Sequence, residues 1–492
     1  MKRRKDVSRL SEHRLHKKQG IVATPLNDRL RDQLTLSSWG KERMPEYLWL
    51  GLILLYYGRE EGLEKAGRVL LDISKKVHNL PHPRLSMVFG LSDEDQHTLF
   101  TIVSTIIDKK VLSPLTVLYR PLTYPVFNDF FNIPQFGFES RIKYLLRAIE
   151  IYFSSGSDET TDLRFLSLSF LIFSDKLRVA KGLTMTIEAL KEYPYTEHSD
   201  EKMRKYRPAI RSMEGGYSGT LENNNNDFCK QFWIDIGMIT SCKPVSIVFD
   251  QNKYTYKDFI RQFQKTLEYI IHSNKEKSLA EDKFDVIVGS ITYALKIFIE
   301  LTEKSLGNSI LGRHGVRTII EILIILKYLL KREVSNHDIW EEYKLYGISK
   351  YKLILLKARE TDLDNTAHFI PLIVDALVNE IRWEEFIDVD LKYFDKHGIR
   401  EKSIEADEKE LFDLFYDYDS SFAHGLWGAV RESAMVHCDN AAHQYHAIPD
   451  INSNQELPDV KADSFKTMQK LLSLLTGIYN VPKELKNGYS IS

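Results

Sequence analysis

Apolar residues recur at steps of three and four positions along most of this chain, and this spacing limits its fold more than any other feature. Such a period places the apolar side chains on one face of an α-helix, which must then pack against another helix. The pattern covers 45–75, a segment that Ser92 begins and Ile107 ends, 142–153, 163–177, 183–192, 256–272, 284–300, 316–331, 368–385, 409–423 and 464–478. The best strand candidate is 244–250, and one extended segment does not make a sheet. We therefore predict a mainly α fold.

Changes of composition along the chain predict its domain organisation. We predict a flexible basic arm over 1–30, an N-terminal helical domain over 31–213, a Gly/Asn-rich loop and connector over 214–250, and a C-terminal helical domain over 251–492. The arm is rich in Lys, Arg and His and lacks the apolar core of a secretory signal. The connector begins with EGGYSGTLENNNND, whose glycines and asparagines are typical of a surface loop.

The charges of the chain are balanced, with 67 Lys and Arg against 69 Asp and Glu and a net charge of −2. This balance excludes a global positive field, so RNA or a protein partner, a second copy of the chain included, would have to bind locally. The longest apolar runs are shorter than the roughly 20 residues of a membrane span, so we expect no membrane association. Three distant cysteines, Cys229, Cys242 and Cys438, predict neither a disulfide framework nor a zinc ribbon, and a reducing cytoplasm is the default location.

Familiar signatures of cofactor chemistry are missing from the sequence, so we predict no cofactor. It has no GxxxxGK[ST], no GxGxxG after a strand, no G-x-S-x-G and no HExxH, which leaves ATPase, dinucleotide, α/β-hydrolase and zincin chemistry unsupported. A dense run of potential metal ligands does occur, namely His437, Cys438, Asp439, His443 and His446. Their spacing matches no standard zinc pattern, so we expect a polar loop and no metal site there.

The segment 316–331 is apolar on nearly all sides, which predicts a buried helix, yet it carries Arg317 and Glu321 one helical turn apart. An ion pair in a core costs desolvation energy unless its remaining donors and acceptors are satisfied. Two interpretations stay open: a buried pair that sets the helix register, or an anion or phosphate clamp in which the carboxylate orients the guanidinium.

A second polar stripe follows the segment 409–423. Asp413, Asp417, Ser420 and His424 lie at steps of four, three and four, and Gly425 follows at once as a natural helix end. A histidine in the last turn is a candidate general acid or base, because the negative helix end raises its proton affinity. The alternatives are a capping histidine above a solvated acidic face, or two aspartates that hold Mg²⁺.

A third candidate is the pair Arg431 and His437, whose R-x5-H spacing is similar to the R-x4-6-H motif of the HEPN ribonuclease superfamily. In that superfamily the arginine would bind the scissile phosphate and the histidine would assist proton transfer. In a chain with 15 histidines such a spacing also arises by chance, so it does not stand alone.

Two longer stretches resemble a widespread bacterial domain family of unknown function. They are RHGVRTIIEILIILKYLLK (313–331) and YDYDSSFAHG (416–425), and the family combines an R-x3-E helix with a helix of the form Y-x3-[SC]-x3-H-G. The resemblance covers about 256–448 and implies a HEPN-like helical bundle of the kind found in phage-defence and toxin-like contexts. Its matching positions are Arg317, Glu321, Tyr416, Ser420 and His424. Asp417 departs from the family, which has a basic residue after the tyrosine.

These observations lead to one main functional hypothesis and two alternatives. The main hypothesis is a bacterial defence or toxin-like protein whose HEPN-like domain binds RNA or cleaves it without a metal ion. In the cleavage version His424 or His437 would move the proton of a ribose 2′-hydroxyl, while Arg317 or Arg431 would stabilise the charge on phosphorus. The alternatives are a non-catalytic sensor or scaffold protein of a defence system, and a Mg²⁺-dependent nucleotide hydrolase. Whether the chain is an enzyme stays open.

Overall fold

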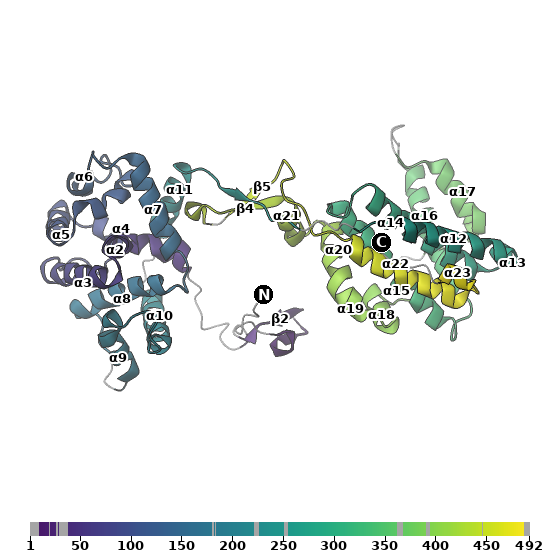
Figure 1. Cartoon of the computed structure of the whole chain (residues 1–492), viewed down its shortest axis with the longest axis horizontal. Helices are drawn as coiled ribbons and strands as arrows, with labels where there is room; N and C mark the ends of the chain where they lie inside the picture. Colours follow the sequence, from purple (N-terminus) through teal and green to yellow (C-terminus); the bar gives the residue numbers. More distant parts are fainter. Residues whose placement is uncertain are drawn as a thin grey trace. The chain divides into compact units, whose positions relative to one another are not determined.

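The computed structural model describes residues 9–18, 20–25, 28, 38–179, 182, 184–220, 226–249, 254–361, 368–389, 394–444 and 446–486. Within these ranges the chain is mainly α-helical, which confirms the predicted fold class (Figure 1). It divides into two compact units. The N-terminal unit comprises Met1–Lys243 and Cys438–His446, and the C-terminal unit comprises Pro244–His437 and Ala447–Ser492.

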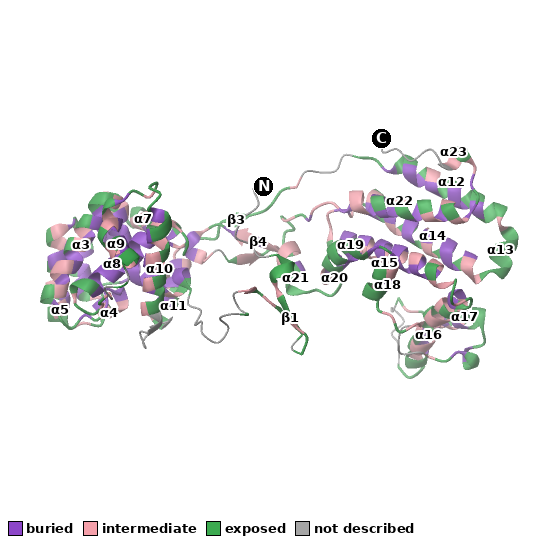
Figure 2. Ribbon diagram, turned by 90° about the horizontal axis from the view of Figure 1, so that it is seen from below, coloured by how far each residue is buried: buried purple, intermediate pink, exposed green. Residues whose placement is uncertain are grey.

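The N-terminal unit is built from amphipathic helices around one large apolar core. Its elements are η2 (Trp39–Arg43), α2 (Met44–Tyr57), α3 (Arg59–Lys76), α4 (Leu85–Phe89), α5 (Asp93–Ile106), η4 (Ser113–Val117), α6 (Pro125–Phe131), α7 (Phe138–Tyr152), α8 (Asp158–Phe173), α9 (Thr184–Glu192), α10 (Met203–Thr220), α11 (Asn226–Met238) and η8 (Ala441–His443). Helices α2 and α8 are buried on nearly all sides, and the others cover them (Figure 2). Ser92 caps α5 as expected, because its hydroxyl accepts a bond from the backbone N–H of Asp95.

A charged group lies inside this apolar core. The carboxylate of Glu214 accepts two 2.8 Å hydrogen bonds from Arg43 and lies 3.5 Å from Arg164. Both guanidiniums stack on the ring of Trp39, at 5.4 Å for Arg43 and 4.6 Å for Arg164. Three elements, η2, α8 and α10, are thus joined by charge pairs that are almost entirely buried.

This network explains why one prediction was wrong. The sequence from Glu214 onwards was expected to form a surface loop, whereas α10 continues through it to Thr220 and Glu214 is only 1 % exposed. Pairing with Arg43 and Arg164 offsets the low helix propensity of the neighbouring glycines. The asparagine-rich residues 221–225 lie outside the described residues.

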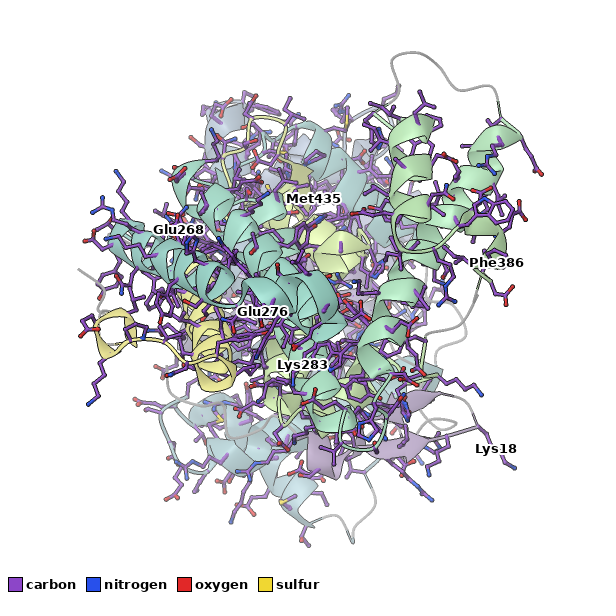
Figure 3. All side chains as sticks on the ribbon, turned by 90° about the vertical axis from the view of Figure 1, so that its right-hand side faces the viewer. Lys18, Glu268, Glu276, Lys283, Phe386 and Met435 are labelled. Carbon is purple, nitrogen blue, oxygen red and sulfur yellow. The ribbon has the colours of Figure 1, made fainter. Side chains whose placement is uncertain are left out.

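The C-terminal unit is a helical bundle with α15 at its centre. Its helices are α12 (Lys257–Ser273), α13 (Lys275–Ala280), α14 (Asp282–Glu303), α15 (Ile310–Arg332), α16 (Ile339–Arg359), α17 (Pro371–Ile381), α18 (Ile399–Glu405), α19 (Lys409–Leu411), η7 (Phe412–Tyr416), α20 (Asp417–Ala423), α21 (Trp427–Ser433), α22 (Lys461–Ile478) and α23 (Lys483–Lys486). Helix α15 packs against α14, α18, α20 and α22, so most of its surface is buried. Figure 3 labels Glu268 of α12 and Glu276 of α13, both exposed, and Lys283 of α14. Lys283 forms an ion pair of 2.8 Å with Glu333.

Two extended segments differ from the expectations. The described part of the predicted basic arm forms an antiparallel hairpin of β1 (Arg14–His16) and β2 (Ile21–Ala23), and residues 1–8 of that arm lie outside the described residues. The predicted strand 244–250 is short, since β3 covers only Pro244–Val245. It joins β4 (Met435–Cys438) and β5 (Ala447–Pro449) in a small sheet, and β4 and β5 are antiparallel.

No helix within the described ranges combines the length and the hydropathy that crossing a membrane would require.

Replacing Glu214 by Ala is expected to destabilise the N-terminal unit strongly. The change leaves two buried guanidiniums without their carboxylate, which typically costs about 3–5 kcal/mol. Thermal unfolding of the full chain, followed by circular dichroism, measures the effect. The control is Glu201→Ala, which removes a side chain that is 88 % exposed and pairs with the equally exposed Arg204, and there we expect less than about 1 kcal/mol. Equal melting temperatures for the two variants would contradict the role assigned to Glu214.

Candidate functional site

Helix α15 carries the two charged residues that the sequence singled out, and both are partly accessible. Ser309 begins the helix, its hydroxyl accepting a bond from the N–H of Gly312. One turn apart, Arg317 and Glu321 form an ion pair of 3.2 Å between Nη1 and Oε2. Each side chain is 22 % exposed, so the pair lies at the edge of the bundle and not in its centre.

The second stretch of the resemblance supplies two more partners for this pair. The hydroxyl of Tyr416 accepts a 2.7 Å bond from Nη2 of Arg317 and donates a 3.2 Å bond to Glu321. Nε of Arg317 donates to the hydroxyl of Ser420 over 3.4 Å, and the guanidinium lies 4.6 Å from the centre of the Tyr416 ring. We call Arg317, Glu321, Tyr416 and Ser420 the Arg317 cluster.

A π-helical turn places Tyr416 in this cluster. Residues Phe412–Tyr416 form the turn η7 between α19 and α20, and a π turn adds one residue to the helical repeat. The ring of Tyr416 is buried, 5 % exposed, and stacks on Phe412 at 5.0 Å. The stripe expected from Asp413 to His424 therefore does not follow one regular α-helix, since its first residue lies in the π turn and His424 comes after the end of α20.

The cluster therefore offers an oriented guanidinium beside two hydroxyl groups and one carboxylate. A guanidinium has five N–H donors, and the bonds to Glu321, Tyr416 and Ser420 hold its plane in one orientation. Glu321 also lines a pocket of about 400 Å³ between α14, α15 and α16, together with Ser290, Tyr293, Thr318 and Tyr343 among others. Such a pocket beside charged groups is a common form of binding site.

The three other predicted site residues lie elsewhere in the C-terminal unit. His424 is exposed at the end of α20, where its backbone N–H binds the carbonyl of Ser420 at 3.1 Å. No hydrogen bond or ion pair joins its ring to the Arg317 cluster within the described part of the chain. Arg431 of α21 donates to the carbonyl of Met435 over 3.0 Å, and His437 lies in β4 opposite Ala447.

The two aspartates considered as Mg²⁺ ligands, Asp413 and Asp417, interact electrostatically with each other, and Asp413 also pairs with a lysine. Asp413 forms an ion pair with Lys409, one turn earlier. Burial and the nearby charge of Asp413 raise the pKa of the Asp417 carboxyl. A carboxyl whose charged form is disfavoured is a weak cation ligand, so this arrangement adds nothing to the Mg²⁺ alternative, which stays a prediction.

Sequence analysis missed one buried acid that lies on the same helix as Ser420. Asp419 is 2 % exposed, and burial raises its pKa to about 7 despite the opposing effect of Arg313. Arg313 is itself buried, lies 5.8 Å from the ring centre of Tyr418 and 5.7 Å from that of Phe422, and donates to the carbonyl of Pro458. The sequence feature that could have indicated this buried pair was Arg313, one turn before Arg317. Asp419 itself does not stand out, because an Asp in an acidic run is usually solvated.

The raised pKa of Asp419 predicts a pH dependence of stability. The folded chain keeps this proton up to about pH 7, whereas the unfolded chain releases it near pH 4, so the free energy of unfolding falls as the pH rises between these values. Asp419→Asn removes that slope. Relative to wild type, the variant should gain about 2–3 kcal/mol between pH 5 and pH 8 in urea unfolding. Asp258→Asn is the control at a position of α12 that is 69 % exposed, and the same pH slope in all three proteins would contradict the assignment.

Comparison with known proteins gives one match. Residues 284–443 match the model of a family of unknown function, DUF5677. The matched range contains all four residues of the Arg317 cluster, together with His424, Arg431 and His437. No curated protein and no solved structure matches the chain. The expected resemblance to a domain family of unknown function is thus confirmed for this range. The HEPN-like character of the bundle stays a prediction. Over 284–443 the chain is similar to DUF5677.

Proposed function

We propose that the C-terminal unit binds RNA through a phosphate group at Arg317 and acts on the bound strand without a metal ion. The observation that carries the proposal is a guanidinium held in one orientation by Glu321, Tyr416 and Ser420, yet 22 % exposed. Orientation before binding lowers the entropy cost of recognising a ligand, and arginine suits phosphate because its planar fork matches two oxygens.

Bond counting supports a phosphate as the ligand. Within the described residues, two of the five N–H donors of Arg317 form hydrogen bonds, to Ser420 and Tyr416, and Nη1 forms an ion pair with Glu321. Further donors on the two Nη atoms are left for phosphate oxygens. The carboxylate of Glu321 keeps the site close to neutral when it is empty. The approach of an anion to Arg317 therefore depends on a short direct contact, in agreement with the absence of a strong positive field over the whole chain.

For cleavage, the chemistry requires a group that removes the proton of the ribose 2′-hydroxyl. His424 lies one turn after Ser420 and is exposed. The proposal requires that an RNA strand held at Arg317 extend to this ring. In this mechanism the imidazole takes the 2′-hydroxyl proton, that oxygen attacks phosphorus, and Arg317 stabilises the charge on the phosphate oxygens. The bond between phosphorus and the 5′-oxygen breaks, and the 5′-oxygen receives the proton back from the imidazolium by way of solvent water, which leaves a 2′,3′-cyclic phosphate. Arg431 and His437 remain the alternative pair for the same two roles.

Removing the guanidinium should weaken RNA binding. A hydrogen bond to a charged group contributes about 1.5–3 kcal/mol, so Arg317→Gln should raise the Kd for a labelled single-stranded RNA about 10–100-fold. Fluorescence anisotropy on the full chain measures this. The control Arg261→Gln changes an arginine of α12 that is 69 % exposed, and it should leave the Kd nearly unchanged.

Because Arg317→Gln alone leaves a carboxylate without its partner, a second variant is needed. Arg317→Gln with Glu321→Gln removes both charges together and lowers the risk of unfolding. If this double variant melts like wild type and still binds RNA with the wild-type Kd, phosphate binding at Arg317 is wrong.

The cleavage step has a separate test. Incubation of a labelled RNA with the full chain in the presence of a chelator should give fragments, and His424→Ala should lower the rate about 100-fold or more, which is typical of losing a general base. His437→Ala is the parallel variant. Normal folding with full cleavage activity in both variants would remove the mechanism. Growth arrest on expression, lost in the same variant as cleavage, would support the predicted toxin-like or defence role.

One observation favours a second candidate, a non-catalytic sensor or scaffold. All three nitrogens of the Arg317 guanidinium have partners inside the unit, as expected for a group that fixes the register of α15 against α20. This candidate expects wild-type RNA behaviour in the charge-free double variant. It also expects Arg317→Gln to lower the melting temperature by an amount that Glu321→Gln partly restores.

A further inference from the structure

Four side chains with metal-binding atoms converge in the N-terminal unit, away from the Arg317 cluster. They are Cys242, which follows α11, and Cys438, His443 and His446 of the segment that η8 belongs to. One ligand atom from each lies within 4.8 Å of every other. We call these four residues the Cys₂His₂ cluster.

The distances inside this cluster match those around one tetrahedral ion. Sγ of Cys242 lies 3.4 Å from Nδ1 of His443 and 3.7 Å from Nε2 of His446, and Sγ of Cys438 lies 3.5 Å from Nδ1 of His443. With Zn–S near 2.3 Å and Zn–N near 2.0–2.1 Å, tetrahedral geometry puts sulfur and nitrogen ligands about 3.6 Å apart. The observed separations cluster around that value.

Backbone carbonyls orient both imidazoles for metal binding. Nε2 of His443 lies 3.2 Å from the carbonyl oxygen of Thr240, and Nδ1 of His446 lies 3.2 Å from the carbonyl oxygen of His443. A carbonyl can only accept, so each of these nitrogens carries the proton in these contacts. The other nitrogen of each ring then presents a lone pair, and those are the two atoms that face the sulfurs. Metal-bound histidines are typically oriented in this way.

The backbone around the two cysteines is also held in place. The N–H of Lys243 donates to Sγ of Cys438 over 3.4 Å, and the N–H of Asp439 donates to the carbonyl of Lys243 over 2.8 Å. Asn440 caps η8 and donates to the carbonyl of Ser241 over 2.8 Å. Next to it, Ala441 and Ala442 are buried in the core of the unit.

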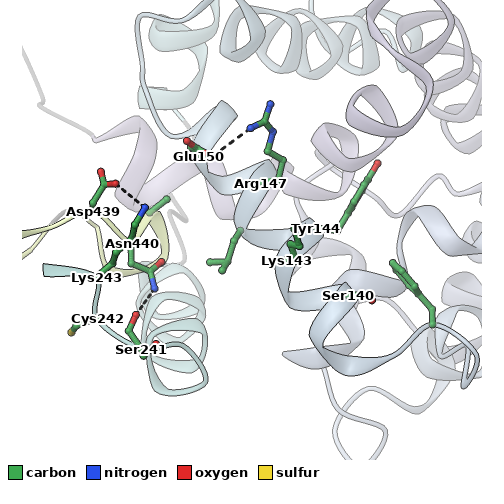
Figure 4. A pocket seen from close by; sticks show the side chains of 13 residues that line it. Ser140, Lys143, Tyr144, Arg147, Glu150, Ser241, Cys242, Lys243, Asp439 and Asn440 are labelled. Atoms are coloured by element: carbon green, nitrogen blue, oxygen red, sulfur yellow. Dashed lines mark hydrogen bonds and ion pairs between the residues drawn. The ribbon is translucent and has the colours of Figure 1, made fainter. Parts of the chain in front are cut away.

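The cluster borders a pocket of about 950 Å³ in the same unit. Figure 4 shows Lys143, Tyr144 and Arg147 of α7 on one side, and Cys242 with its neighbours on the other. Only Cys242 of the four ligands lines this pocket. A centre with four protein ligands has no open position for a substrate, so the geometry indicates a structural ion and not a catalytic one.

We infer that Cys242, Cys438, His443 and His446 bind one structural Zn²⁺ ion. Two thiolates and two imidazoles in a tetrahedron suit Zn²⁺ better than the oxygen-preferring Mg²⁺ or Ca²⁺. The ion links Cys242 to a segment about 200 residues further along the chain, and it thereby helps to hold η8 on α7 and α11. Because unfolded chains lack such a site, part of the binding energy becomes folding energy.

The metal content of the purified full chain tests this inference. Wild type, expressed without a metal-binding tag in zinc-supplemented medium, should contain about one zinc per chain by mass spectrometry after gel filtration. Replacing the zinc by Co²⁺ should give the absorption of a tetrahedral thiolate complex, which reads the ligand set without any substitution. Cys242→Ser and His446→Ala should each lose most of the metal. Cys229→Ser, the same change at the cysteine outside the cluster, should retain it.

Three results would overturn the inference. The first is a wild-type protein that neither contains zinc nor gives the Co²⁺ spectrum. The second is full zinc content in the variants at Cys242 and His446. The third is a disulfide between Cys242 and Cys438 in protein purified under reducing conditions. If Cys242→Ser does not fold, the wild-type Co²⁺ spectrum and zinc content decide the question.

Discussion

The packing of the C-terminal unit is constrained by the desolvation energy of two charged residues on a helix that is buried on most sides. Helix α15 packs against four other helices, and still carries Arg317 and Glu321 at 22 % exposure. Neither charge can be left without partners at that depth, because desolvation would then outweigh the packing gained. The hydroxyl of Tyr416 accepts a hydrogen bond from Arg317 and donates one to Glu321. These two bonds connect the π turn η7 to α15.

The N-terminal unit also contains a buried charge that needs partners of opposite charge, but the arrangement is different. There the charge is deeper, since Glu214 is 1 % exposed, and two arginines and an indole ring surround it. Arg43 and Arg164 are 9 % and 7 % exposed, whereas Arg317 is 22 % exposed. The two networks therefore have different roles in our account: Glu214 joins helices, whereas Arg317 both joins helices and meets solvent.

The apolar period and the R-x3-E spacing predicted α15 and its ion pair, because both depend on local helical geometry. The resemblance added Tyr416 and Ser420, which no spacing rule connects to Arg317. His424 was expected in the same pocket from its four-residue spacing after Ser420, but it comes after the last residue of α20, where the helix has ended. The proposed Zn²⁺ site could not be found from spacing for another reason: Cys242 lies about 200 residues before the other three residues, and only the fold brings them together. A loop was expected from Glu214 onwards because this stretch is rich in glycine and asparagine. The ion pairs of Glu214 with Arg43 and Arg164, which favour the helix, cannot be read from the sequence.

The central claim is that Arg317 and Tyr416 belong to one coupled network, and a double-mutant cycle tests it most directly. Urea unfolding of the full chain would be compared for wild type, Arg317→Met, Tyr416→Phe and the double variant, using the transition of the C-terminal unit. We expect a coupling energy of about 1 kcal/mol or more, within the usual range for residues in contact. A coupling energy near zero, with both single variants folded, would contradict the account.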